Sequence, residues 1–94
     1  MKISDEIITS RQNRIVVEAI KLSEKKARDA AGLFRFDGLK LFDEALDKGV
    51  EIVRVLLSAS KSDALIDKIN AKKQLPDGVP VTFLSDYIFA KVSE

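Results

Sequence analysis

Cationic side chains gather in the first third of the chain. Residues 11–28 include six Lys or Arg residues and two Glu residues, a local charge of +4, whereas the whole 94-residue chain carries +1. Such a concentration of positive charge favours an anionic partner, and nucleic acid is the commonest one. The side chains that we expect to contact a nucleic acid are Arg11, Asn13, Arg14, Lys25, Lys26, Arg28 and Arg35.

Lys25, Lys26 and Arg28 are the leading candidates for phosphate contacts. Each can neutralise a phosphate, and the guanidinium of Arg28 can contact one through two N–H groups. The alternative interpretation is a solvated helix end, because cations at the C-terminal end of a helix also suit its dipole. The charge pattern alone leaves both interpretations open.

The other candidates surround Asn13 or follow the basic cluster. Asn13 can donate its amide to a phosphate or a base edge, or it can cap a helix. Arg11 and Arg14 flank it and can belong to the same surface. Arg35 either joins that surface or pairs with a neighbouring acid.

Two aromatic residues, Phe34 and Phe36, lie close to the basic cluster. Aromatic side chains on a strand can stack on bases. Their spacing places both rings on one face of a short strand, and in a chain of this size we expect that face to be core. The sequence therefore predicts that neither Phe contacts RNA.

Other kinds of chemistry have little support. The chain contains no Cys and no His, which excludes thiolate nucleophiles, imidazole bases and the usual zinc ligands. The carboxylates Asp43, Glu44 and Asp47, and the pair Asp63 and Asp67, have the spacing of solvated helix faces. We therefore expect this chain alone not to be catalytic and to hold no cofactor or metal.

Helices and strands alternate along the sequence. The apolar spacing predicts a first helix that Ser10 or Asn13 caps and that ends at Gly32, and a last helix that Ser85 caps. The second half of the first helix is polar all round, so we expect either a solvated last turn or a break near Ser23. The predicted helices are 13–31, 39–48, one that follows a capping signal at residues 60–63 and runs to about residue 72, and the segment after 85. The predicted strands are 33–37, 52–58 and 79–84, and residues 76–78 form a turn. This order predicts an α/β fold, a three-layer sandwich with a mainly parallel sheet preceded by an N-terminal helix.

The composition describes one folded domain, residues 1–94. Apolar residues make up 46% of the chain and charged residues 33%, and the longest apolar runs are too short to cross a bilayer. The first residues lack the apolar stretch of a secretory signal. We expect a cytoplasmic protein without membrane contact.

Several segments in order resemble one known family. Ser10 to Asn13, the cluster 25–28, the segment 32–38 and the helix 39–46 are similar to the N-terminal substrate-binding domain of SpoU/TrmH-type RNA ribose 2′-O-methyltransferases. The family often has Pro where this chain has Arg14, Val where it has Phe36, and Glu where it has Asp37. The resemblance is strongest over residues 10–49 and continues as a pattern beyond residue 52.

This resemblance implies a fold like that of the kink-turn-binding ribosomal proteins and a role in holding structured RNA. Ribosomal RNA is the expected substrate, with transfer RNA as the alternative. The resemblance also implies a catalytic domain downstream, absent from this chain, that binds S-adenosylmethionine and commonly dimerises. The competing hypothesis is a non-catalytic interaction or dimerisation module that uses the apolar residues of 87–92 and has no RNA affinity of its own.

Overall fold

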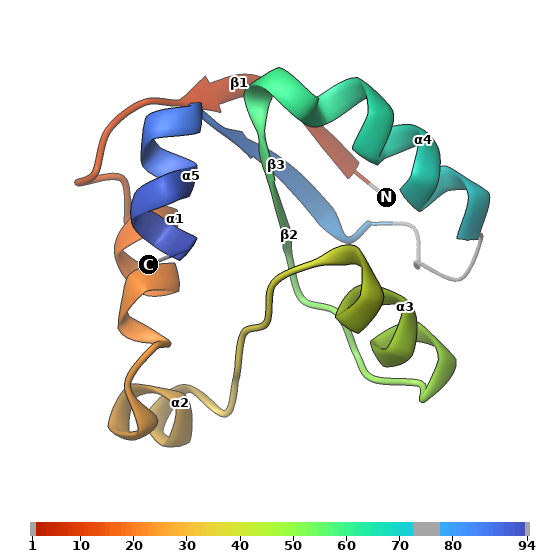
Figure 1. The fold of residues 1–94 in the computed structure, drawn as a ribbon. Helices are drawn as coiled ribbons and strands as arrows, with labels where there is room; N and C mark the ends of the chain where they lie inside the picture. The colour runs from red at the N-terminus through yellow and green to blue at the C-terminus, as the bar shows by residue number, and fades with distance from the viewer. Residues whose placement is uncertain (1, 73–77, 94) are drawn as a thin grey trace.

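Three parallel strands form the centre of the molecule (Figure 1). They are β1 (Lys2–Ile8), β2 (Val55–Ser58) and β3 (Pro80–Leu84), and β3 lies between the other two. The computed structural model describes residues 2–72 and 78–93. The predicted α/β class and the parallel sheet are confirmed.

Helices cover both faces of this sheet. They are α1 (Arg14–Lys21), α2 (Lys25–Ala31), α3 (Leu39–Asp47), α4 (Ser62–Lys72), which follows the 3-10 turn η1 (Ala59–Lys61), and α5 (Asp86–Ser93). Figure 1 shows α1 and α5 side by side on one side of the sheet, and α3 and α4 on the other. Helix α2 extends beyond the end of α1, away from the sheet.

Each face of the sheet has its own apolar core. One cluster comprises Val16, Leu84, Ile88 and Val92, and the other comprises Phe42, Leu57, Ile69 and Val81. The neighbouring residues Leu56 and Leu57 contact different clusters, because successive side chains of a strand point to opposite faces. This alternation produces the three layers and explains why the strand is apolar throughout.

The predicted helix ends are confirmed. The side chain of Asn13 accepts a hydrogen bond from the backbone N–H of Ile15 at 2.9 Å and so caps α1. Gly32 ends α2 with a φ of 68°, a conformation that other residues rarely adopt. Ser85 precedes α5 and accepts a hydrogen bond from the N–H of Ile88 at 3.4 Å. Of the two alternatives for the polar second half of the first helix, the break near Ser23 is the correct one, and it separates α1 from α2.

The placement of one strand was wrong. Residues 33–37 form no strand, and the sheet instead takes its third strand from β1, which precedes the helix that we expected to come first. The pairing of β1 with β3 is irregular, because the register shifts between Ile3 and Ile7. That shift, together with the intervening polar residues, hides the two-residue alternation by which a strand is recognised.

Smaller differences concern the ends and faces of elements. Strand β2 begins at Val55 rather than at Ile52, and Leu41, an apolar residue of α3, is 47% exposed. Gly78 lies in a turn, but the rest of the predicted turn, Pro76 and Asp77, lies outside the described residues. No helix in the described part of the chain is long and apolar enough to cross a bilayer.

Candidate nucleic-acid interface

Lys25 and Lys26 form the first turn of α2, and both are exposed. The Nζ atom of Lys25 lies 2.8 Å from a carboxylate oxygen of Asp29, but these two side chains are 81% and 65% exposed. The first turn of a helix is the positive end of its dipole, where cations are unfavourable. Because the helix breaks near Ser23, the dipole explanation that applied to a C-terminal helix end does not apply to these two lysines.

Helix α1 carries a second row of cations. Arg14 is the first residue of α1 and pairs with Glu18 at 3.1 Å, and the Arg14 side chain is 91% exposed. Lys21 lies seven residues later, two turns along the same side of the helix, and is also exposed. Arg11 lies exposed in the turn before α1. Pro is favoured at the first position of a helix, so Arg14 replaces the family's Pro at a position that also accommodates other residues.

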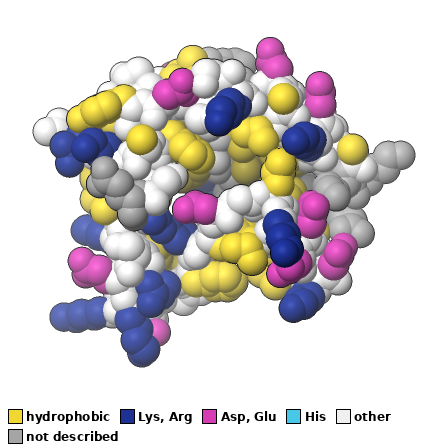
Figure 2. All heavy atoms as spheres, in the orientation of Figure 1, with side chains coloured by type: hydrophobic (Ala, Val, Ile, Leu, Met, Phe, Trp, Pro, Cys, Tyr) yellow, Lys and Arg dark blue, Asp and Glu magenta, His cyan; other side chains and the backbone are white. Residues whose placement is uncertain are grey.

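We call these exposed cations of α1, α2 and the preceding turn the basic surface: Arg11, Arg14, Lys21, Lys25 and Lys26. Figure 2 shows Lys and Arg side chains repeated down the side of the molecule on which α1 and α2 lie, with acidic side chains between them. Lys21 was not among the predicted site residues, although its charge contributed to the local excess. The salt bridges on this surface are exposed, so exchanging a carboxylate for a phosphate costs little.

Arg28 has a structural role that the sequence did not reveal. Its Nη1 atom donates hydrogen bonds to the backbone carbonyls of Leu22 and Ser23, at 3.0 and 2.9 Å. These carbonyls follow the last residue of α1, where a helix leaves its acceptors unsatisfied. Arg28 therefore joins α2 to the end of α1, and its half-buried side chain is not part of the basic surface.

Arg35 also serves the end of α1. Its Nη1 atom donates to the carbonyl of Ala19 at 3.1 Å. This contact is a role that the sequence did not reveal, and the salt bridges of the described residues do not include Arg35. Asn13 was also predicted to contact RNA, but it is half-buried and its side chain caps α1. Three of the seven predicted RNA-binding residues thus stabilise the α1–α2 unit.

Phe34 and Phe36 lie in different environments. Phe36 is half-buried and packs against the cluster around Phe42 and Val81, as expected. Phe34 is 62% exposed, so the expectation that it belongs to the core was wrong. The reason is that residues 33–37 do not enter the sheet, and the side chains therefore do not alternate between two buried faces.

Most of the carboxylates face solvent as expected. Glu44, Asp47, Asp63 and Asp67 are exposed, whereas Asp43, which we expected on the solvent face of its helix, is half-buried. Within the described residues, no group of three acidic side chains is placed to hold a metal ion.

Asp86 lies away from the basic surface, where β3 leads into α5. Its Oδ1 atom accepts a hydrogen bond from the backbone N–H of Ser60 at 3.1 Å. Hydrogen bonds from the side chain and backbone of Ser60, and the nearby charge of Lys61, lower the pKa of Asp86 below its ordinary value. This carboxylate joins α5 to η1 and has a structural role.

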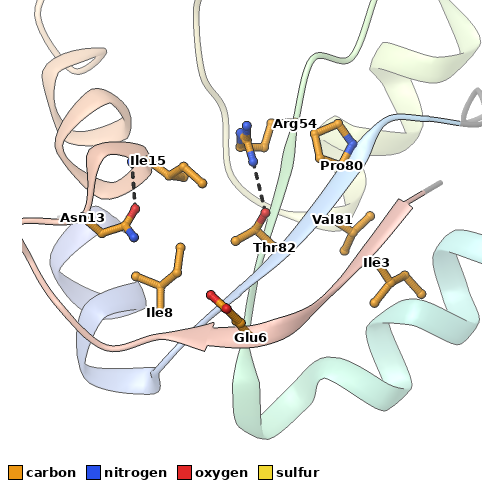
Figure 3. A pocket seen from close by; sticks show the side chains of 9 residues that line it. All are labelled: Ile3, Glu6, Ile8, Asn13, Ile15, Arg54, Pro80, Val81 and Thr82. Atoms are coloured by element: carbon orange, nitrogen blue, oxygen red, sulfur yellow. Dashed lines mark hydrogen bonds between the residues drawn. The ribbon is translucent and has the colours of Figure 1, made fainter.

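A shallow hollow of about 340 Å³ lies on the sheet beside α1 (Figure 3). It is lined by Ile3, Glu6, Ile8, Asn13, Ile15, Arg54, Pro80, Val81 and Thr82. Its polar side chains are engaged with the protein: Arg54 donates to Thr82 at 3.1 Å, and Asn13 caps α1.

The surface expected for the interaction module is mostly core. Ile88 and Val92 are buried in the cluster with Val16 and Leu84. Tyr87 is exposed, with the Lys91 ammonium 5.5 Å from its ring centroid. The segment 87–92 therefore presents one aromatic ring rather than an apolar face.

Comparison with known proteins identifies one family. The model of the MRM3-like substrate binding domain matches residues 13–94, which include α1, α2 and the whole basic surface except Arg11. Strand β1 lies before the matched region. Among curated proteins and among solved structures, none matched the chain significantly.

Proposed function

The chain belongs to the MRM3-like substrate binding domain family, the substrate-binding domains of SpoU-family rRNA methyltransferases, and we propose that it holds ribosomal RNA for ribose 2′-O-methylation. In this proposal the chain binds RNA and does no chemistry. A separate catalytic domain, which binds S-adenosylmethionine, transfers the methyl group. Transfer RNA is the alternative substrate.

The observation that carries this proposal is the position of Lys25 and Lys26. Two adjacent, exposed lysines at the positive end of α2 are unfavourable for the helix, so its own stability does not account for them. A phosphate bound there relieves that repulsion. The same two residues lie in the segment that most resembles the methyltransferase family.

The basic surface can follow an RNA backbone. Arg14 and Lys21 lie about 10 Å apart along α1, and the chain then turns directly into Lys25 and Lys26. Contacts of this kind position RNA without reading its sequence. We therefore infer that preference for a particular RNA comes from its shape and its unpaired nucleotides.

Charge reversal tests the proposal. We expect K25E/K26E to weaken binding to a labelled ribosomal RNA fragment, measured by fluorescence anisotropy at several salt concentrations. The slope of log affinity against log salt should fall by roughly 0.7 to 0.9 for each phosphate that the variant no longer neutralises. Glu at the first turn of a helix is favourable, but the carboxylate that K25E introduces would face Asp29 in place of the present ion pair. These small effects oppose each other, so the variant should unfold close to the parent's temperature.

The matched control is K40E/K48E. Lys40 and Lys48 are exposed at the two ends of α3, on the other side of the sheet, and their reversal changes the net charge by the same amount. This control should lower affinity much less than K25E/K26E. Equal losses of affinity would mean that only net charge matters, and a parent domain that binds no RNA at low salt would overturn the proposal.

A further inference from the structure

Phe34 is an exposed aromatic ring held in place by its neighbours. The segment that carries it, residues 33–37, is not a strand, yet it is tied to the α1–α2 unit on both sides of Phe34. The backbone N–H of Leu33 donates to the carbonyl of Arg28 at 3.2 Å, and the side chain of Arg35 donates to the carbonyl of Ala19 at 3.1 Å. The ring is therefore presented by an anchored backbone.

One side of the ring is supported by a second ring. The centroids of Phe34 and Phe36 are 6.2 Å apart and their planes are inclined by 39°, within the range of favourable aromatic pairs. Phe36 packs against the cluster around Phe42 and Val81. Phe34 thus rests on a side chain that is fixed to the core, while most of its own surface faces solvent.

The setting of this ring is cationic. The hydrogen bond between Leu33 and Arg28 places Phe34 beside the last turn of α2, and Lys25 and Lys26 form the first turn of the same helix. Seven helical residues span about 10 Å, so the ring and the two ammonium groups lie within the reach of a few nucleotides. An apolar protein surface would not complement these charges, whereas a nucleotide supplies both a π-face and a phosphate.

We propose that Phe34 stacks on an unpaired base of the RNA while Lys25 and Lys26 hold phosphates nearby. This inference rests on the proposed function and adds to it a requirement for a single-stranded loop, bulge or end. A base that is paired within a helix has its faces covered by its neighbours and cannot stack on the ring.

The test uses the 94-residue chain and two RNAs of equal length, a hairpin with an unpaired loop and a fully paired duplex. We expect F34A to weaken hairpin binding by roughly five- to a hundredfold, the range for removal of one base stack. Duplex binding should stay unchanged. The unfolding temperature should fall only slightly, because the mostly exposed ring loses little besides its contact with Phe36. The salt slope for the hairpin should also stay unchanged, because stacking releases no counterions.

A second variant reports on the stacked ring directly. The chain has no Trp, so F34W introduces a single indole, which should keep hairpin affinity and show a fluorescence change with the hairpin but not with the duplex. L41W is the matched control, because Leu41 is exposed on α3, away from the basic surface. Its fluorescence should respond to neither RNA.

The two proposals fail differently. A parent chain that binds neither RNA counts against the proposed function itself. The stacking inference is overturned if F34A binds the hairpin as tightly as the parent does and F34W shows no fluorescence change. The proposed phosphate contacts would be unaffected by that result. Equal weakening of hairpin and duplex binding by F34A also overturns it, because a duplex offers no unpaired base.

Discussion

Side chains of the same type have different tasks within this small domain. Asn13, Arg28 and Arg35 bind backbone groups at the two ends of α1, whereas the described structure shows no such role for Lys25 and Lys26. A helix end offers unsatisfied carbonyls that a guanidinium can satisfy at several angles. An ammonium at the opposite end of a helix finds only N–H groups.

The sequence could not distinguish these roles. Lys25, Lys26 and Arg28 form one charge run, and the difference between them depends on where α1 ends and α2 begins. The fading of the apolar spacing allows a break near Ser23 but also a solvated last turn, and the residue types allow either Ser10 or Asn13 as the cap. The path by which Arg28 reaches back to the carbonyls of Leu22 and Ser23 is a tertiary interaction, which no local pattern encodes.

Substitution of Arg28 tests this assignment. We expect R28A to lower the free energy of unfolding by about 1–2 kcal/mol, because two carbonyls are left without a charged donor. R28K should recover only part of this stability, since an ammonium does not reproduce the fork of a guanidinium. Denaturant unfolding provides the measurement.

The RNA affinity of R28A, compared with that of K25E/K26E, completes this test. Under conditions in which R28A remains folded, its salt slope should match that of the parent, whereas K25E/K26E should show the smaller slope. An R28A domain of unchanged stability with a reduced slope would return Arg28 to the residues that bind RNA.

At the scale of elements, the surroundings of residues 33–37 explain the main error. Their alternation is that of a strand, but a strand also needs a partner. The segment is instead tied to the α1–α2 unit through Leu33 and Arg35, while β1 and β2 take both edges of the central strand β3. Helices were easier to predict, because their caps and periodicity are local. For this reason, helix ends were predicted correctly at Asn13, Gly32 and Ser85.

Gly32 links α2 to the segment that carries Phe34, and its conformation can be tested. We expect G32A to destabilise the domain by about 1 kcal/mol, because a Cβ atom is unfavourable in the left-handed region. A Cβ atom there would meet no atom within 4 Å, so the cost comes from the backbone alone. Thermal unfolding followed by circular dichroism measures this difference.

The companion variant is G32N. Asn tolerates the left-handed conformation better than Ala does, so G32N should destabilise the domain less than G32A. If Ala and Asn destabilise the domain equally, a cause other than backbone conformation would be needed.

At the scale of the whole molecule, the sheet separates two cores while the basic surface follows α1 and α2 along one side (Figure 2). The α/β class and the helices on both faces follow from apolar periodicity, which can be read directly from the sequence. The strand that completes the sheet does not, because β1 is irregular and lies before the residues that match the family.

The neighbouring residues Ile7 and Ile8 test whether β1 completes the sheet in solution. Ile8 packs against the cluster of Val16 and Leu84, and its carbonyl accepts a hydrogen bond from the N–H of Ser85 at 2.9 Å. Ile7, its neighbour in the strand, is 53% exposed. We expect I8A to lower the free energy of unfolding by about 1–2 kcal/mol and I7A by less than about 0.5 kcal/mol.

The pair is matched because both substitutions remove the same atoms and the same β-branched residue type from one strand, so their difference isolates burial. Denaturant unfolding of the two variants and the parent gives that difference, and native-state hydrogen exchange should show protected amides in β1. Equal, small effects with unprotected amides would mean that β1 does not pair with β3. The β1 edge of β3 would then be unpaired, and the sheet would consist of β2 and β3 alone.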